Sequence, residues 1–204
     1  MGKKTFWDRV AFIYDIAESM NGRAYRAMLS SIVSLVRDKS EVLECAAGTG
    51  AISISVSSKA KSVLCTDLSL SMLKQARRKA EKKRLNNIIF AERNLLALPE
   101  KDGSFDVVIA ANVIHLLEKP HDALAELWRV TRNGGLLIVP TFLTQGSKSG
   151  FRFLIKIYKM IGFQPIHNFS ESQYREMLET SDLPKPDIRV LQGKVPVGFA
   201  VFRK

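Results

Sequence analysis

Residues Val42–Gly50 read Val-Leu-Glu-Cys-Ala-Ala-Gly-Thr-Gly, an apolar run that reaches an acidic residue and opens into a turn of small residues. Gly48 and Gly50 tolerate positive φ and have no side chain, so the backbone of this turn can approach a ligand closely. The helix expected next directs its free N–H groups at the same place. Asp67 closes the following apolar run, 21 positions after Ala46, where doubly wound folds place a carboxylate that binds a ribose. The spacing indicates a nucleoside-bearing cofactor.

The positions of the glycines indicate which cofactor. A dinucleotide turn has glycines at its first, third and sixth positions, and neither starting point completes that pattern: one gives Ala46, Gly48, Ala51 and the other Gly48, Gly50, Ser53. The pattern acidic-x-Gly-x-Gly-x-Gly fits better, as Glu44, Ala46, Gly48, Gly50, with alanine in the first glycine position. This second pattern resembles the motif of class I S-adenosylmethionine-dependent methyltransferases. A plain turn between a strand and a helix is the alternative for this segment alone.

The composition predicts one folded domain. The chain has 204 residues, of which 46% are hydrophobic, enough for a substantial core. No apolar run is long enough to span a bilayer. The first residues show neither the hydrophobic stretch of a signal peptide nor the sequence pattern for myristoylation. Cys45 and Cys65 each lie near the end of an expected buried strand, so we interpret them as core residues and not as a metal pair or disulfide. The expected location is the cytoplasm.

The chain is strongly basic, with 31 basic and 20 acidic residues and a net charge of +11. Such a charge is compatible with nucleic acid, an anionic membrane surface or acidic substrates and does not choose among them. Much of it lies in Lys74–Arg84, where only Glu81 offsets the basic residues. Met72, Leu73, Ala76 and Ala80 give this segment a buried stripe, so a solvated outer helix face is the simplest interpretation.

Strand and helix patterns alternate through the middle of the chain, which predicts an α/β fold: a doubly wound, mostly parallel sheet covered by helices on both faces. The last two strand-like runs, 187–192 and 197–203, are joined by four residues, which favours an antiparallel pair. Expected helices cover 5–20, 22–37, 51–58, 69–85, 121–130, 151–163 and 170–180; expected strands cover 41–45, 62–66, 87–92, 105–111 and 135–141. The single domain then comprises N-terminal lid helices (1–38), a cofactor-binding core (41–141), substrate cap helices (149–180) and a terminal hairpin (187–203).

Further segments extend the resemblance over nearly the whole chain, and all are similar to the methyltransferase branch that includes the ubiquinone/menaquinone-biosynthesis C-methyltransferases. They are Phe6-Trp7-Asp8 with Tyr14-Asp15, Asn94–Pro99 with Gly103–Asp106, Asn112–His115, and Arg132–Gly135. Their order is much more specific than the glycine turn alone. The resemblance implies a seven-stranded sheet that ends in an antiparallel hairpin, and S-adenosylmethionine as the cofactor.

Two residues depart from the family pattern. Ala46 replaces the first glycine, which narrows the turn by one methyl group. Asn94 stands where the family usually has an aspartate that accepts a hydrogen bond from the adenine amino group. An amide oxygen can still accept this bond, although without charge. We therefore expect weaker cofactor binding rather than none.

The resemblance also implies residue roles on the cofactor side. Gly48 and Gly50 let the backbone lie against the methionyl and ribose parts, while Glu44 helps to hold the amino group. Asp67 accepts both ribose hydroxyls; the alternative is that Asp67 caps the helix that follows it. By resemblance, Leu68 and Leu95 flank the adenine. The remaining cofactor-binding residues are Ala46 in the turn, Asn94 and Asn112.

Methyl transfer from a sulfonium is an in-line displacement, in which alignment and exclusion of water matter most and a dedicated base is not always required. His115 is the best candidate near the methyl group, because its reference pKa near 6.5 would let it accept a proton at neutral pH. Packing against the cofactor is an equal alternative. Tyr14 in the expected lid is the second catalytic candidate, with ordinary helix packing as its alternative. No metal ligand set is expected. His167 and His121 have no further support.

The segment Phe151–Phe163 bears on the methyl acceptor. Arg152, Lys156 and Lys159 fall along one helical face, and apolar residues supply the rest. This pattern suits a helix at an anionic membrane surface or a lid over an apolar acceptor, with a helix packed on the sheet edge as the alternative. The sequence thus predicts a methyltransferase for a small, apolar or lipid-like acceptor, either a quinone-precursor carbon or a phospholipid amine, with peripheral membrane contact as an option. A nucleic-acid methyltransferase is less favoured, and a cofactor-binding protein without catalytic activity is the third alternative.

Overall fold

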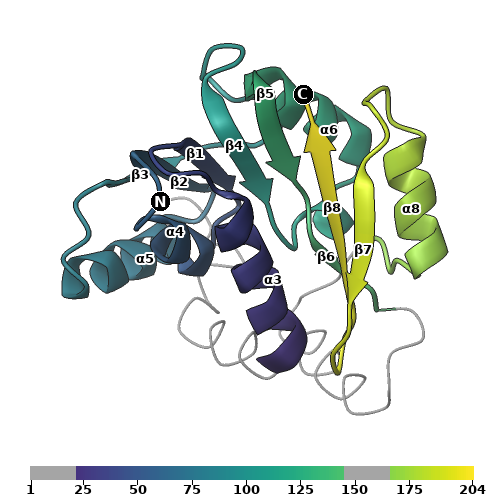
Figure 1. Cartoon of the computed structure of the whole chain (residues 1–204), viewed down its shortest axis with the longest axis horizontal. Coiled ribbons are helices and arrows are strands. Elements are labelled where there is room, and N and C mark those ends of the chain that lie inside the picture. Colours follow the sequence, from purple (N-terminus) through teal and green to yellow (C-terminus); the bar gives the residue numbers. More distant parts are fainter. Residues whose placement is uncertain (1–21, 145–165) are drawn as a thin grey trace, which may run out of the picture.

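The computed structural model describes residues 22–144 and 166–204 of the chain (Figure 1). The helices are α3 (Gly22–Leu35), α4 (Ala51–Val56), α5 (Leu70–Lys82), the short 3-10 helix η1 (Ile114–Leu116), α6 (Pro120–Val130) and α8 (Glu171–Glu179). The strands are β1 (Glu41–Cys45), β2 (Ser62–Asp67), β3 (Ile88–Glu92), β4 (Phe105–Ala110), β5 (Thr131–Ile138), β6 (Thr141–Phe142), β7 (Asp187–Leu191) and β8 (Val197–Arg203). The predicted alternation of strands and helices is confirmed.

These strands form one sheet in which β3, β2, β1, β4 and β5 are neighbours and run parallel. β8 lies antiparallel to both β5 and β7, so the arrow of β8 points against those of β4 and β5 (Figure 1). The predicted antiparallel hairpin of the last two strands is therefore confirmed. The carboxyl ends of the parallel strands meet at one edge of the sheet, where open α/β folds bind their ligands.

The sheet has eight strands where seven were predicted, and one proline explains the difference. Ile138 at the end of β5 pairs with Val201, and Thr141 in β6 pairs with Gly198. Both strands therefore lie along the same side of β8 and form one interrupted strand. Pro140 stands at the interruption and has no N–H for the ladder.

β5 begins at Thr131 and not at the predicted Gly135. Thr131 pairs with Phe105, and the register then shifts, so that Leu136 pairs with Val107. The residues of the predicted turn, 132–135, thus form an irregularity inside the strand. A Cβ at Gly135 would lie 2.7 Å from two backbone carbonyl oxygens, so only glycine fits there.

The two faces of the sheet have separate cores. α3 and α4 cover one face together with inward side chains of β1, β4, β5 and β8, and α5 packs on the same face over β2 and β3. α6 and α8 cover the opposite face. The cysteines Cys45 and Cys65 are buried and free, and burial raises the pKa of Cys45 to about 12, as suits the predicted core residues.

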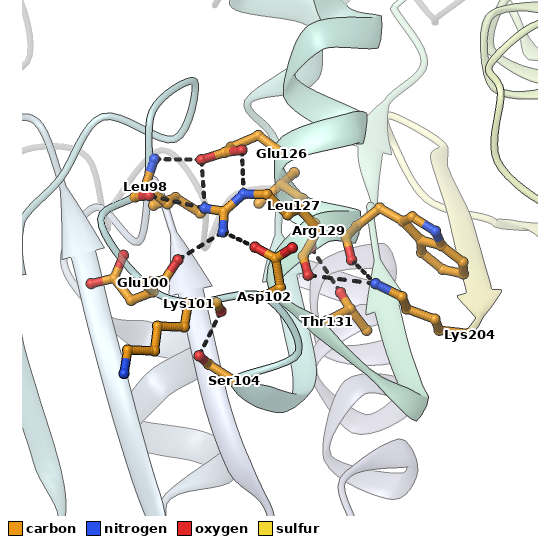
Figure 2. A network of polar contacts seen from close by, with 11 residues as sticks. Leu98, Glu100, Lys101, Asp102, Ser104, Glu126, Leu127, Arg129, Thr131 and Lys204 are labelled. Carbon is orange, nitrogen blue, oxygen red and sulfur yellow. Dashed lines mark hydrogen bonds and ion pairs between the residues drawn. The ribbon is translucent and has the colours of Figure 1, made fainter.

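A polar network attaches the loop between β3 and β4 to α6 (Figure 2). The Arg129 guanidinium donates to Glu126 Oε2 at 2.8 Å, to Asp102 Oδ1 at 2.6 Å and to the carbonyl oxygens of Leu98 and Glu100, both at 2.9 Å. Glu126 in turn accepts the Leu98 N–H at 2.7 Å, and the hydrogen bond from Arg129 lowers the Glu126 pKa. The network therefore attaches to α6 the loop whose first residues include Asn94 and Leu95, the predicted adenine contacts.

The predicted helices 5–20 and 151–163 lie outside the residues that the structure describes. Within residues 22–144 and 166–204, no helix is long and apolar enough to cross a membrane. The same residues contain no cluster of three or more His, Cys, Asp or Glu side chains that could hold a metal ion.

Candidate functional site

The turn between β1 and α4 has an unusual backbone conformation. Ala46, Gly48 and Gly50 all have positive φ, at 51°, 55° and 74°, which glycine adopts freely and alanine adopts at a cost of roughly 1–2 kcal/mol. The Ala47 N–H donates to the Thr66 carbonyl at 2.9 Å and ties the turn to β2. The chain therefore makes the predicted tight turn, and Ala46 strains it.

Gly50 has a packing role that the sequence did not reveal. A Cβ on Gly50 would lie 2.7 Å from the Ala76 Cβ of α5. A side chain there would push α4 and α5 apart, because the clash is with a short side chain held against its own helix. The predicted contact of Gly50 with the cofactor stays a prediction, and the structure supplies a second reason for this glycine.

Glu44 lies beneath the turn and is 2% exposed. Its Oε2 accepts the Ser53 N–H at 2.7 Å and also the Ser53 hydroxyl. Gly50, the N-cap residue of α4, has no side chain to do this. The carboxylate of β1 therefore stabilises the first turn of α4, where a negative charge is favoured by the helix dipole. The sequence predicted a cofactor ligand at Glu44 and did not reveal this capping role.

Asp67 faces the glycine turn. Its Oδ2 accepts the Gly48 N–H and its Oδ1 accepts the Ser69 N–H, both at 2.8 Å. The N-cap of α5 is Ser69, whose Oγ accepts the Met72 N–H at 3.2 Å. Ser69 therefore provides the N-cap of α5, the role considered as the alternative for Asp67. The carboxylate lies beside the turn, where ribose binding was predicted.

The predicted adenine contacts differ in exposure. Leu68 is 61% exposed, whereas the Leu95 side chain is 7% exposed and belongs to the core under α6. Asn94 Oδ1 accepts the Leu96 N–H at 3.0 Å, which places this amide in a local turn. The Arg93 N–H donates to the Asp67 carbonyl at 3.2 Å, so the segment starts directly beside Asp67.

Asn112, immediately after β4, contains a buried acceptor without a partner. Its φ is 54° and its N–H donates to the Pro140 carbonyl at 2.8 Å. The side chain is 8% exposed, and Oδ1 has no hydrogen-bond partner among the described residues. An unsatisfied buried acceptor costs about 1–3 kcal/mol. Asn112 Oδ1 is therefore an acceptor that a donor on a bound cofactor or acceptor molecule could satisfy.

His115 in η1 is buried at 8% exposure, with Nδ1 3.0 Å from the Thr141 Oγ1. Burial, and to a smaller extent the nearby His167, lowers the pKa of His115 to about 4. The imidazole is therefore neutral at pH 7, as the prediction required, but it is a much weaker base than the reference pKa of 6.5 implied. Desolvation of the charged form is the physical cause.

His167, which sequence reasoning passed over, lies beside His115. Its N–H donates to the His115 carbonyl at 3.0 Å, and its ring Nε2 lies 3.0 Å from the Leu117 carbonyl oxygen. The ring also stacks on Phe169 with centroids 5.4 Å apart. His167 thus attaches the chain before α8 to the chain after β4. Only the long sequence separation hid this contact. His121, as expected, starts α6 at the surface, where it contacts the Met177 carbonyl.

α8, the described part of the predicted substrate cap, packs on the sheet. Tyr174 and Leu178 are fully buried, and the Tyr174 hydroxyl donates to the Val139 carbonyl. A Cβ at Gly198 would lie 2.5 Å from the Tyr174 ring, so β8 leaves space for this ring. A contact of α8 with the acceptor stays a prediction. Tyr14 and Phe151–Phe163 lie outside the described residues.

Comparison with known proteins gives concordant results. The methyltransferase domain family matches residues 43–139. The ubiquinone/menaquinone biosynthesis C-methyltransferase of Zymomonas mobilis is 32% identical over 84% of this chain and 73% of its own length. The demethylmenaquinone methyltransferase of Renibacterium salmoninarum is 34% identical over 81% of this chain and 69% of its own length. The fold is similar to an S-adenosylmethionine-dependent methyltransferase of Thermotoga maritima, with a TM-score of 0.73 and 20% identity over 98% of this chain and 99% of that one.

Proposed function

Because the chain belongs to the class I S-adenosylmethionine-dependent methyltransferases, we propose that it methylates a ring carbon of a lipid-soluble quinone precursor in its reduced form. The observation that carries this proposal is the 32% and 34% identity, over more than four fifths of the chain, to two enzymes named for quinone substrates. One of them is named a C-methyltransferase, which is why we propose carbon as the methylated atom.

The reduced acceptor follows from the chemistry of the donor. When bound, S-adenosylmethionine supplies a methyl carbon activated by a sulfonium sulfur, so the acceptor has to provide an electron-rich atom. A ring carbon beside a phenolic hydroxyl is electron-rich in a hydroquinone and electron-poor in the oxidised quinone. We propose an in-line transfer, in which the protein aligns the two partners and excludes water.

On the cofactor side, the residues around the β1–α4 turn hold the donor. Asp67 accepts the ribose hydroxyls, and the turn at Gly48 lets the backbone approach the cofactor. Glu44 supports the first turn of α4 through Ser53. Asn94 accepts from the adenine amino group, and Leu68 lies against the ring. The support for these roles is their position around one turn, with the Asp67 carboxylate 2.8 Å from the Gly48 nitrogen.

On the acceptor side, the end of β4 offers a buried and uncharged surface. Asn112, Val113, Ile114 and His115 are each at most 8% exposed, and His115 is neutral because its pKa lies at about 4. Such a surface suits an aromatic ring better than a charged substrate. We propose that Asn112 Oδ1 accepts a hydrogen bond from the acceptor hydroxyl, because it has no other donor within the described residues.

His115 orients the same hydroxyl rather than acting as a strong base. We assign the Thr141 hydroxyl, 3.0 Å away, as the donor to Nδ1, which leaves Nε2–H for the acceptor. Because its pKa is about 4, the imidazole is neutral at pH 7, and its Nε2–H donates to the oxygen of this hydroxyl, whose proton is donated to Asn112. The proton released from the ring carbon then passes to solvent after transfer. Tyr14 as a lid residue stays a prediction.

The test is a transfer assay with defined acceptors. The purified protein is incubated with S-adenosylmethionine and a reduced demethylated menaquinone that carries a short side chain, and the product is identified by mass and by NMR. We expect one new methyl group on the ring carbon. The oxidised quinone and the acceptor already methylated at that carbon serve as controls and should not react. A methyl group on oxygen or nitrogen, or no transfer to any reduced quinone, would contradict the proposal.

A further inference from the structure

The outer side of α5 has an unusual concentration of positive charge without ion pairs. The exposed basic residues of α5 and of the two positions after it are Lys74, Arg77, Arg78, Lys82, Lys83 and Arg84, here called the α5 basic face. None of these six forms an ion pair within the described part of the chain. Arg129 and Arg132, by contrast, each bind a carboxylate at 2.6 Å or less. Only Glu81 offsets the charge on α5.

The helix geometry directs these charges away from the protein. Met72, Leu73, Ala76 and Ala80 are buried against the sheet. Residues four apart lie on one side of a helix, so Leu70, Lys74 and Arg78 share the opposite, exposed side. Arg77 lies with its guanidinium carbon 5.2 Å above the Phe90 ring, which fixes its stem while the charge stays at the surface.

Exposed leucines adjoin the α5 basic face at the end nearest the site. Leu70, the first residue of α5, is 62% exposed, and Leu68 is 61% exposed. Leu96, after β3, is 43% exposed. Since Asp67 pairs with Glu92 at the ends of β2 and β3, these leucines follow neighbouring strand ends at the ligand-binding edge. Figure 1 shows α5 alongside β2 and β3 at one end of the molecule.

We propose that the α5 basic face, together with Leu70 and Leu96, docks the protein on an anionic membrane surface. Basic residues beside exposed apolar ones on a helix lying flat are the features of interfacial membrane binding. The complementary charge of anionic lipid headgroups identifies the partner. This inference rests on the proposed lipid-soluble acceptor, which resides in such a membrane. Nucleic acid is the disfavoured partner, because the exposed large apolar residues here are aliphatic and not aromatic rings on which bases stack.

Docking in this way brings the ligand-binding edge to the lipid. Leu70 lies three positions after Asp67, the last residue of β2, so insertion of Leu70 at the headgroup level sets the carboxyl ends of β2 and β3 against the bilayer. The acceptor then reaches the site without crossing water. The charges along α5 attract the surface, while the leucines determine which end of the helix is deepest.

The test compares two triple variants of the full chain that lose the same charges. Lys74→Gln, Arg78→Gln and Lys82→Gln remove three cations from the α5 basic face; Arg37→Gln, Lys101→Gln and Lys194→Gln remove three exposed cations from elsewhere. Binding is measured by sedimentation with vesicles of phosphatidylglycerol and phosphatidylcholine, at low ionic strength and at roughly 1 M salt, where the screening length is about 3 Å. Leu70→Gln tests the apolar part.

We expect the wild type to bind anionic vesicles at low salt and the α5 triple variant to bind about a hundredfold more weakly. The control triple variant should bind as the wild type does. High salt should release most of the protein, and Leu70→Gln should remove the part that salt leaves bound. Absence of wild-type binding at low salt, or equal losses in both triple variants, would overturn the proposal.

Two further measurements separate this inference from its alternatives. The first is binding of the wild type to a short RNA and to a DNA duplex. If the wild type binds either one, the α5 triple variant does not, and vesicle binding is weak, the α5 basic face binds nucleic acid and the proposal is overturned. Methyl transfer to a water-soluble, short-chain acceptor should be the same in the wild type and in both triple variants. Failure of that transfer in the wild type would instead contradict the proposed acceptor, whatever the vesicles show.

Discussion

Two parts of the same sheet edge satisfy their polar side chains differently. At the ends of β1 and β2, the carboxylates of Glu44 and Asp67 accept hydrogen bonds from backbone N–H groups of Ser53, Gly48 and Ser69. At the end of β4, Asn112 Oδ1 has no partner within the described residues, and His115 is buried and neutral, since its pKa lies at about 4. The proposed cofactor side thus carries charged groups, and the proposed acceptor side carries neutral polar groups.

The difference indicates how each side binds. Backbone N–H groups of the β1–α4 turn and of Ser53 and Ser69 already hold the two carboxylates in place, so we expect little reorganisation of these side chains if a cofactor binds there. The end of β4 instead keeps an acceptor that is unsatisfied until a ligand supplies a donor. We therefore propose that the charged side serves cofactor affinity and that the neutral side serves recognition of an uncharged ring. Four changes test this comparison.

The largest expected effect is the loss of charge on the cofactor side. Asp67→Ala removes two charge-assisted hydrogen bonds to the ribose, each worth roughly 1.5–3 kcal/mol. The affinity for S-adenosylhomocysteine, measured by isothermal titration, should fall at least about tenfold. Asp187→Ala is the matched control, because it removes a carboxylate that is exposed on β7, at the other end of the sheet, and the affinity of this variant should not change. Unchanged affinity in folded Asp67→Ala would mean that Asp67 serves only the turn.

The next effect concerns pH and the buried histidine. In the unfolded chain His115 has a pKa near 6.5, and in the folded chain about 4, so the unfolded state binds more protons between these values. The free energy of unfolding therefore has its full value above pH 6.5. It falls by up to about 3 kcal/mol as the pH drops toward 4. Denaturant unfolding of the wild type and His115→Gln at pH 7 and pH 4.5 measures it.

His115→Gln should show a smaller loss of stability between the two pH values than the wild type. The control is His121→Gln, which replaces a histidine exposed at the start of α6 and should behave like the wild type. In addition, the acid limb of kcat/KM should lie well below pH 6. A limb near pH 6.5 that disappears in His115→Gln would show that His115 titrates normally and acts as a base.

A smaller effect is expected from a change at Asn112, on the proposed acceptor side, which should raise stability and lower activity. Asn112→Gly removes the unsatisfied acceptor and suits the positive φ of this position, so thermal unfolding should show a gain of about 1 kcal/mol. Methyl transfer should fall about fivefold because one hydrogen bond to the acceptor is lost, while cofactor affinity should hold. A loss of stability would show that Asn112 Oδ1 has a partner in the folded protein.

The smallest effect tests the neutral residue on the otherwise charged cofactor side. Asn94→Asp keeps an oxygen that can accept the Leu96 N–H, now at 3.0 Å from Asn94, and adds charge toward the adenine amino group. Binding of S-adenosylhomocysteine should tighten severalfold, which corresponds to less than about 1 kcal/mol. Weaker binding by titration would mean that Asn94 uses its amide donor, or that it does not face the adenine.

The sequence alone was sufficient for the fold, the enzyme class and the cofactor, and all three are confirmed. Each rests on local signals. β1 was predicted with its observed bounds because five residues of strand pattern lead directly into a glycine turn. The last two strands were predicted to pair antiparallel because a four-residue connection allows little else. Signals of this kind depend on backbone conformation over a few residues, which short stretches of sequence determine.

Only the tertiary structure decided how the site residues behave, because burial and long-range contacts set their chemistry. The clash that reserves Gly50 for glycine comes from Ala76, 26 positions away. The low pKa of His115 comes from desolvation among elements brought together from β4, β6 and the segment before α8. Pro140 was visible in the sequence, but its carbonyl bond to Asn112 was not. The sequence determined which groups stand at the sheet edge; the packing around them determined which are charged, which are neutral and which await a ligand.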